Sequence, residues 1–178
     1  MKSIPPPSSI HFILTGGTID SFFDGTRDTA VPRTHSILPR FLKSLCLYVP
    51  LHFTEVCMKD SRDITQQDVK KVKVAIEKSP AKKIIVTHGT YTMGDTGRYL
   101  KANLGRKDQT VLLTGSMIPI EGFSPSDGPF NLGYAVAEVQ RLPVGVYVAM
   151  NGKIFDPAEI AKEIAKGRFF SVFGEKGK

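Results

Sequence analysis

The feature that most constrains this chain is a pattern at the ends of three short apolar runs. The runs cover residues 10–15, 82–87 and 109–114, and they end in the sequences Thr-Gly-Gly-Thr, Thr-His-Gly-Thr and Thr-Gly-Ser-Met. Short apolar runs that stop at turn residues predict buried strands. In a parallel sheet these three ends would meet at one edge. We therefore expect a site there, lined by hydroxyls and backbone N–H groups.

The other predicted elements alternate between strand and helix along the whole chain. This alternation indicates an α/β fold, in which helices cover both faces of a mainly parallel sheet. We found no linker that divides the 178 residues. We expect residues 1–9 to form a loose arm and residues 10–178 to form a single domain. Further strands are predicted over 51–58, 144–150 and 168–173. Helices are predicted over 35–48, 130–140 and 157–165. Another helix begins at a cap formed by Thr65 and Asp68, and one more ends near residue 104.

Charge and cysteine content exclude several classes of function. The net charge is +7, but the lysines are scattered, so we expect no nucleic-acid partner and favour a small anionic substrate. Cys46 and Cys57 lack the spacing of metal ligands and are expected to be free thiols in a reducing compartment. The start of the chain has no signal-peptide core, and no apolar run approaches about 18 residues. We expect a cytoplasmic protein with no membrane partner.

Thr18 follows the first predicted strand and two glycines. The glycines permit a tight turn and let another molecule approach the backbone closely. The Thr18 hydroxyl would then lie at the carboxyl end of a strand, where ligands bind in open α/β sheets. The alternative is structural, with Thr18 serving only to cap the next segment.

Several segments, taken in order, resemble the bacterial-type L-asparaginase/glutaminase family of threonine amidohydrolases. The resemblance implies a flavodoxin-like three-layer sandwich, as in the N-terminal domain of asparaginases. It covers nearly the whole chain, and its strength lies in the shared order and spacing of the motifs. The matching residues are Thr-Gly-Gly-Thr-Ile at 15–19, Asp-Ser-Arg-Asp at 60–63, Thr-His-Gly-Thr at 87–90 with Thr92 and Met93, Thr-Gly-Ser-Met at 114–117, Ser-Asp-Gly-Pro-Phe-Asn-Leu at 126–132, Val-Ala-Met-Asn at 148–151, and Lys162.

The resemblance implies that Thr18 is the nucleophile and that Thr90 and Lys162 assist it. Thr18 would attack a side-chain amide, release ammonia and form an acyl-enzyme that water hydrolyses, because a threonine hydroxyl needs a base to become nucleophilic. Lysine serves as a base only if burial lowers its pKa. The resemblance also assigns Ser61 and Arg62 to the substrate carboxylate, with Gly17, Gly89, Tyr91 and Ser116 completing the binding site. The resemblance implies that neither a cofactor nor a metal is needed. It also implies that the reactants are water and a small amide, and that the protein is a homodimer.

The sequence departs from the family pattern at Tyr91, in the lid and in length. The family has an aspartate at the position of Tyr91, which binds the α-ammonium group of the substrate. A tyrosine, with a pKa of about 10, is neutral and cannot supply that charge. The predicted lid, residues 21–33, contains no tyrosine to polarise the nucleophile, and Phe22, Phe23 and Asp24 lie near that place. We expect a short form without the family's C-terminal domain.

Two hypotheses follow from these departures. The first is an amidohydrolase of the asparaginase type, acting on L-asparagine or a related small amide with altered selectivity for the α-amino group. The second is a degenerate family member that binds a small amide or acid without hydrolysing it.

Overall fold

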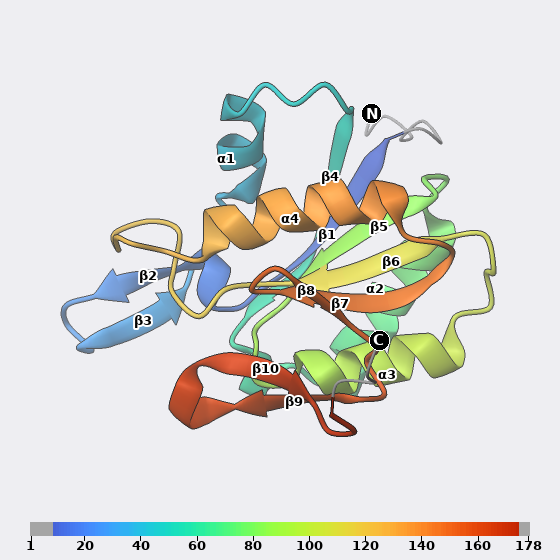
Figure 1. Ribbon diagram of the computed structural model, residues 1–178. Coiled ribbons are helices and arrows are strands. Elements are labelled where there is room, and N and C mark those ends of the chain that lie inside the picture. Colours follow the sequence, from blue (N-terminus) through green and yellow to red (C-terminus); the bar gives the residue numbers. More distant parts are fainter. Residues whose placement is uncertain (1–8, 175–178) are drawn as a thin grey trace.

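The apolar runs form the centre of a six-stranded sheet in the computed structural model, which describes residues 9–174 (Figure 1). Five neighbouring strands are parallel, and the sixth pairs antiparallel at one edge. The predicted mainly parallel α/β sheet is therefore confirmed. In spatial order the strands are β4 (Leu51–Lys59), β1 (Ile10–Gly16), β5 (Lys83–Thr87), β6 (Thr110–Thr114), β7 (Gly145–Met150) and β8 (Lys153–Phe155).

Helices cover both faces of this sheet and make the fold a three-layer sandwich (Figure 1). Strand β1 shows how the layers arise, because its side chains alternate between the two faces. Ile13 belongs to the core under α2 and α3, whereas Phe12 and Leu14 belong to the core under α1 and α4. The four helices are α1 (Leu38–Ser44), α2 (Gln66–Lys78), α3 (Met93–Asn103) and α4 (Gly128–Arg141).

The predicted cap of α2 is confirmed in detail. The Thr65 hydroxyl accepts a hydrogen bond from the Asp68 backbone N–H at 3.2 Å, and the Asp68 carboxylate accepts one from the Thr65 N–H at 3.0 Å. The ammonium of Lys59 lies 2.6 Å from the same carboxylate and is the main cause that lowers the pKa of Asp68 to about 2. The cap thus ties the start of α2 to the end of β4.

The predicted helix over 157–165 is wrong. The segment forms strand β9 (Ile160–Glu163) and the short helix η3 (Ile164–Lys166), and β9 pairs antiparallel with β10 (Arg168–Ser171). The helical apolar spacing is overridden by a ladder whose partner strand lies only a few residues further along. The predicted final strand is therefore present as β10, but it belongs to this two-stranded sheet and not to the edge of the main one.

Two other segments differ from the prediction. The predicted loop over 21–33 forms a hairpin of β2 (Ser21–Asp24) and β3 (Thr29–Pro32). The helix predicted over 35–48 is shorter, because α1 begins only at Leu38, with Pro39 in its first turn, where its fixed φ and missing N–H are tolerated.

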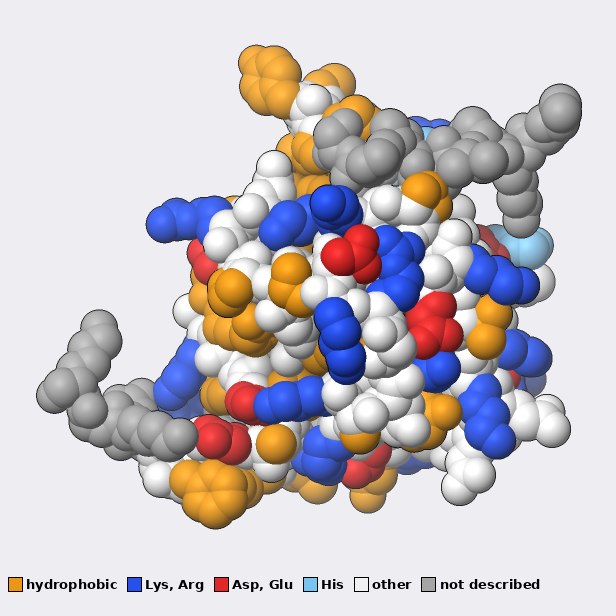
Figure 2. Space-filling view, turned by 90° about the vertical axis from the view of Figure 1, so that its right-hand side faces the viewer, with side chains coloured by type: hydrophobic (Ala, Val, Ile, Leu, Met, Phe, Trp, Pro, Cys, Tyr) orange, Lys and Arg blue, Asp and Glu red, His pale blue; other side chains and the backbone are white. Residues whose placement is uncertain are grey.

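Figure 2 shows one face of the molecule, where lysine and arginine side chains are interspersed with acidic ones. Ion pairs of the described residues include Lys73–Glu77 at 3.1 Å and Arg106–Asp108 at 2.8 Å. Within residues 9–174, none of the helices has the length and apolarity needed to cross a membrane. The predicted arm lies outside the described residues except for Ser9, which is buried.

Candidate active site

Glycines allow the loops after β1, β5 and β6 to pack backbone against backbone. Gly16 and Gly17 have φ values of +85° and +79°, a region that side chains with a Cβ rarely adopt. A Cβ on Gly17 would lie 2.4 Å from the backbone nitrogen of Gly89, and one on Gly115 would lie 2.3 Å from the carbonyl oxygen of His88. The three strand ends singled out in the sequence are therefore in direct contact.

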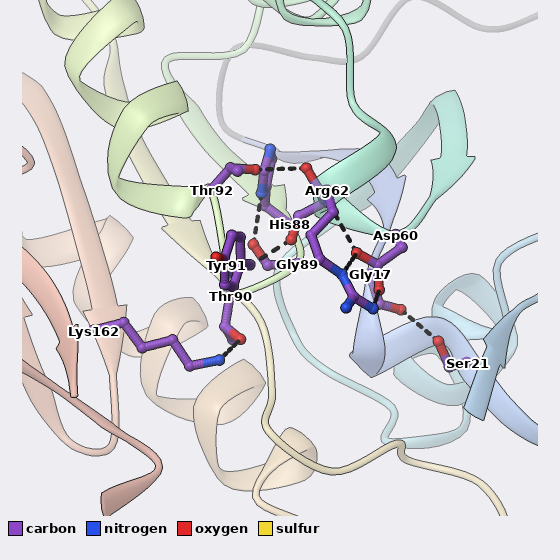
Figure 3. Close-up of polar contacts among 11 residues, drawn as sticks. Gly17, Ser21, Asp60, Arg62, His88, Gly89, Thr90, Tyr91, Thr92 and Lys162 are labelled. Atoms are coloured by element: carbon purple, nitrogen blue, oxygen red, sulfur yellow. Dashed lines mark hydrogen bonds and ion pairs between the residues drawn. The ribbon is translucent and has the colours of Figure 1, made fainter. Parts of the chain in front are cut away.

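Thr18 begins the short helix η1 (Thr18–Asp20) immediately after this turn. The Gly17 carbonyl accepts hydrogen bonds from the Asp20 N–H at 3.1 Å and from the Ser21 hydroxyl at 3.1 Å (Figure 3). The Gly17 N–H donates to the Lys59 carbonyl at 2.8 Å. These bonds fix the backbone that presents Thr18.

Asp20 anchors the other end of η1. It is completely buried, and its carboxylate accepts bonds from the Ser36 hydroxyl and, at 2.9 Å, from the Ile37 N–H. Burial raises the pKa of Asp20 to about 6. Asp20 therefore links the segment that carries Thr18 to the start of α1.

A pocket of about 200 Å³ opens at this edge of the sheet. Its wall combines residues from the turn after β1, the loop after β4, the loop after β5 and strand β9, several of which Figure 3 shows. Most of the residues predicted for the site are brought together here, from segments far apart in the sequence. The lining residues are Thr18, Asp60, Ser61, Arg62, Gly89, Thr90, Tyr91 and Lys162.

Lys162 reaches from β9 to Thr90 (Figure 3). Its Nζ donates to the Thr90 hydroxyl at 2.6 Å, and Thr90 itself is buried. Burial is the main cause that lowers the pKa of Lys162, and Arg62 acts in the same direction, while Asp60 opposes them. A lysine that loses its proton more readily, bonded to a buried hydroxyl, has the arrangement required of a base with a relay.

Ser61 holds the loop after β4 against the loop after β5. It lies in the short helix η2 (Ser61–Asp63), and its hydroxyl accepts a bond from the Tyr91 N–H at 3.2 Å. Its carbonyl accepts a bond from the Thr92 hydroxyl at 2.8 Å. Gly89 is required here, because a Cβ at that position would lie 2.6 Å from the Ser61 Cβ.

Asp60 lines the pocket, whereas the sequence analysis names it only as part of the motif at 60–63 and gives it no role of its own. Its carboxylate accepts bonds from the Arg62 N–H and Nε, both at 2.9 Å, and from Nη2 at 3.1 Å (Figure 3). The side-chain bond from Arg62 is the main cause that lowers the pKa of Asp60. The signal available in the sequence was an aspartate two residues before an arginine, a spacing that favours a cap of this kind.

The structure does not bring every predicted residue to the pocket. Ser116 is buried, and its hydroxyl donates to the Ile118 carbonyl at 2.6 Å. Phe22 lies under the guanidinium of Arg33, and Phe23 packs against Phe123 with ring centroids 6.2 Å apart. Asp24 accepts two bonds from Thr26 within its own hairpin. Among the described residues, Gly17, Ser116 and these three lid candidates do not line the pocket.

Residues 9–174 contain no group of three or more His, Cys, Asp or Glu side chains that could hold a metal ion. Cys46 is exposed and Cys57 is half-buried, and both are free thiols. Burial raises the pKa of Cys57 to about 11.

Comparison with known proteins matches most of this chain to one protein family. The family model "Asparaginase, N-terminal" matches residues 9–170. A glutaminase-asparaginase of Acinetobacter glutaminasificans is 33% identical over 186 residues, covering 96% of this chain and 55% of that protein. L-asparaginase 2 of Escherichia coli is 29% identical over 168 residues, covering 86% of this chain and 46% of that protein.

A crystal structure of a probable cytoplasmic L-asparaginase from Campylobacter jejuni superposes with a TM-score of 0.78 and 28% identity, covering 92% of this chain and 53% of that one. The chain thus spans about half the length of the relatives it matches.

Proposed function

Because this chain belongs to the asparaginase family, we propose that it is an amidohydrolase that releases ammonia from L-asparagine or a related small amide. The observation that carries the proposal is the hydrogen bond of 2.6 Å between Lys162 and Thr90, in a pocket that Thr18 also lines. A nucleophilic hydroxyl, a relay hydroxyl and a base with a lowered pKa are the parts that acyl transfer from an amide requires.

The proposed reaction has two steps. In the first, the Thr18 oxygen bonds to the amide carbon while its proton passes through the Thr90 hydroxyl to the neutral Lys162 amine. The proton then moves to the amide nitrogen as the C–N bond breaks, so ammonia leaves and an ester on Thr18 remains. In the second step, water attacks the ester under the same base, which releases the acid and restores Thr18.

Backbone donors would stabilise the oxyanion in both steps. The N–H of Gly17 is engaged by the Lys59 carbonyl, and the N–H of Tyr91 by the Ser61 hydroxyl. Because these two N–H groups are engaged, we assign this role to other backbone N–H groups in the turns that carry Thr18 and Thr90. Arg62 and the Ser61 hydroxyl would bind the substrate carboxylate, since guanidinium and hydroxyl donors suit an anionic acceptor.

The predicted cytoplasmic location and homodimer are part of the same proposal. The structural neighbour from Campylobacter jejuni is described as a probable cytoplasmic L-asparaginase, which supports the location. Exposed aromatic side chains at Phe170 and Phe173 favour a partner surface. Light scattering coupled to size exclusion tests the homodimer, and a monomer at micromolar concentration would contradict it.

The test is ammonia release from L-asparagine, L-glutamine, D-asparagine and succinamate by the intact chain and by Thr18→Ala. Thr34→Ala is the matched control, because Thr34 is exposed and does not line the pocket. We expect release by the intact chain and Thr34→Ala and none by Thr18→Ala. Binding of these compounds without release by the folded, intact chain would instead support the degenerate binder.

A further inference from the structure

The charge of the pocket restricts which amide fits it. Its ionisable lining consists of Asp60, Arg62, Lys162 and the phenol of Tyr91. Both carboxylate oxygens of Asp60 are engaged by Arg62, at 2.9 Å and 3.1 Å. The one carboxylate of the lining is thus already paired with a guanidinium, and Lys162 adds a second basic group.

Three other acidic side chains lie close by in the sequence or in an adjoining hollow, but none of them lines the pocket. Asp95 lines an adjoining hollow of about 140 Å³ that shares Tyr91 and Lys162 with the pocket, but it pairs with Arg98 at 2.6 Å. Glu163 follows Lys162 in the chain and pairs with Lys166 at 2.7 Å. Asp63 lies on the same turn as Arg62 and favours the charged form of that arginine.

We infer that the preferred substrate is a small acid with a terminal amide and a carboxylate but no α-ammonium group, of which succinamate is the simplest example. This inference rests on the proposed function and specifies its substrate class. The substrate carboxylate would accept hydrogen bonds from the Arg62 guanidinium and the Ser61 hydroxyl, which both belong to residues that line the pocket. Among the described residues, the one carboxylate that lines the pocket is that of Asp60, which Arg62 already engages, so an ammonium group would lose its hydration at a net cost.

Tyr91 is the residue that sets this selectivity. It lines both the pocket and the adjoining hollow, and 59% of its surface is exposed. Its backbone N–H is held by Ser61, so the position of the side chain relative to the pocket is fixed at its base. An aspartate here would add the unpaired carboxylate that an α-ammonium needs, and the exposure of the site means that the fold should accept it.

The experiment measures kcat/KM for succinamate and L-asparagine with the intact chain, Tyr91→Asp and Tyr91→Phe. We expect the intact chain to favour succinamate by about tenfold or more, the scale of one lost charged hydrogen bond. Tyr91→Asp should shift the ratio toward L-asparagine by about tenfold to a hundredfold. Tyr91→Phe keeps the ring without adding charge and should leave the ratio near that of the intact chain.

A preference of the intact chain for L-asparagine would overturn the inference, whether or not the variants fold. If no variant releases ammonia, the proposed function fails, and calorimetric binding of the two compounds to the intact chain decides the inference alone. Tighter binding of succinamate would then support it, and equal or tighter binding of L-asparagine would overturn it.

Discussion

Replacing Gly89 with alanine tests whether the loops around the pocket are in direct contact. The new Cβ would lie 2.6 Å from the Ser61 Cβ and 2.7 Å from its Oγ, so the Ser61 loop must move away. Overpacking of this kind costs about 1–3 kcal/mol of unfolding free energy. The movement would also weaken the hydrogen bonds of 3.2 Å and 2.8 Å that Ser61 makes with Tyr91 and Thr92. We expect Gly89→Ala to lose about 2 kcal/mol.

The same movement should also reduce kcat/KM by up to about a hundredfold, because a displacement of about 1 Å in a catalytic site has an effect of this size on the rate. The assays are urea unfolding followed by circular dichroism, and kcat/KM for ammonia release. The control is Gly133→Ala on α4, where an added Cβ meets nothing within 4 Å. It should gain about 0.5–1 kcal/mol and keep its activity.

A double variant sharpens the result. Ser61→Gly removes the Cβ and Oγ that the Gly89→Ala methyl group would meet, so the two changes together should cost less stability than the sum of each alone. If Gly89→Ala matched the intact chain in both stability and activity, the close contact between these loops would be refuted.

Lys162, Asp20 and Thr65 can be tested by single substitutions. Lys162→Met should lower kcat at least a hundredfold with little change in unfolding free energy. In the intact chain we expect activity to rise with pH as Lys162 loses its proton, and Lys162→Met should abolish this rise. Burial raises the pKa of Asp20 to about 6, above about 3.9 in the unfolded chain, so folding favours the protonated form and stability should fall as the pH rises from 4 to 6. Urea unfolding of the intact chain and of Asp20→Asn at pH 4 and pH 7 measures this loss: the unfolding free energy of the intact chain should fall by on the order of 3 kcal/mol relative to that of the variant, and an identical pH dependence would contradict it. Thr65→Ala should cost about 1 kcal/mol in the same assay through loss of the α2 cap, and a change within error would show that the cap contributes nothing.

The sequence predicted the central sheet because its information there is local. Apolar runs bounded by glycine and threonine mark the ends of β1, β5 and β6, and the threonine cap marks the start of α2. Each of these signals lies within a few residues of the element it predicts. The meeting of the strand ends then follows from the parallel order of the sheet.

The environment of Lys162 was not predictable from local sequence. The segment has helical apolar spacing, but pairing of Phe169 opposite Lys162 makes it a strand. That pairing places the lysine against Thr90, 72 residues earlier in the chain. The resemblance to the asparaginase family identified the residue, although the element that carries it was predicted wrongly.

Ser116 and Asp60 show the same limit on a smaller scale. Ser116 follows a strand end of the predicted type, but its hydroxyl is used by the nearby Ile118 carbonyl. Asp60 was known only as part of a motif, and its pairing with Arg62 emerges from the turn that η2 forms. Local geometry of two or three residues decided each case.

If Thr18 carries the acyl group during turnover, chemical quenching of the reaction should trap that group on it. The intact chain is mixed with succinamate or L-asparagine, quenched with acid during turnover, digested with trypsin and mapped by mass spectrometry. Cleavage after lysine and arginine separates residues 3–27, which contain Thr18, from residues 84–98, which contain Thr90. We predict an acyl adduct on the first peptide, located at Thr18 by fragmentation and lost in Thr18→Ala. An adduct on the peptide 84–98 would contradict the account.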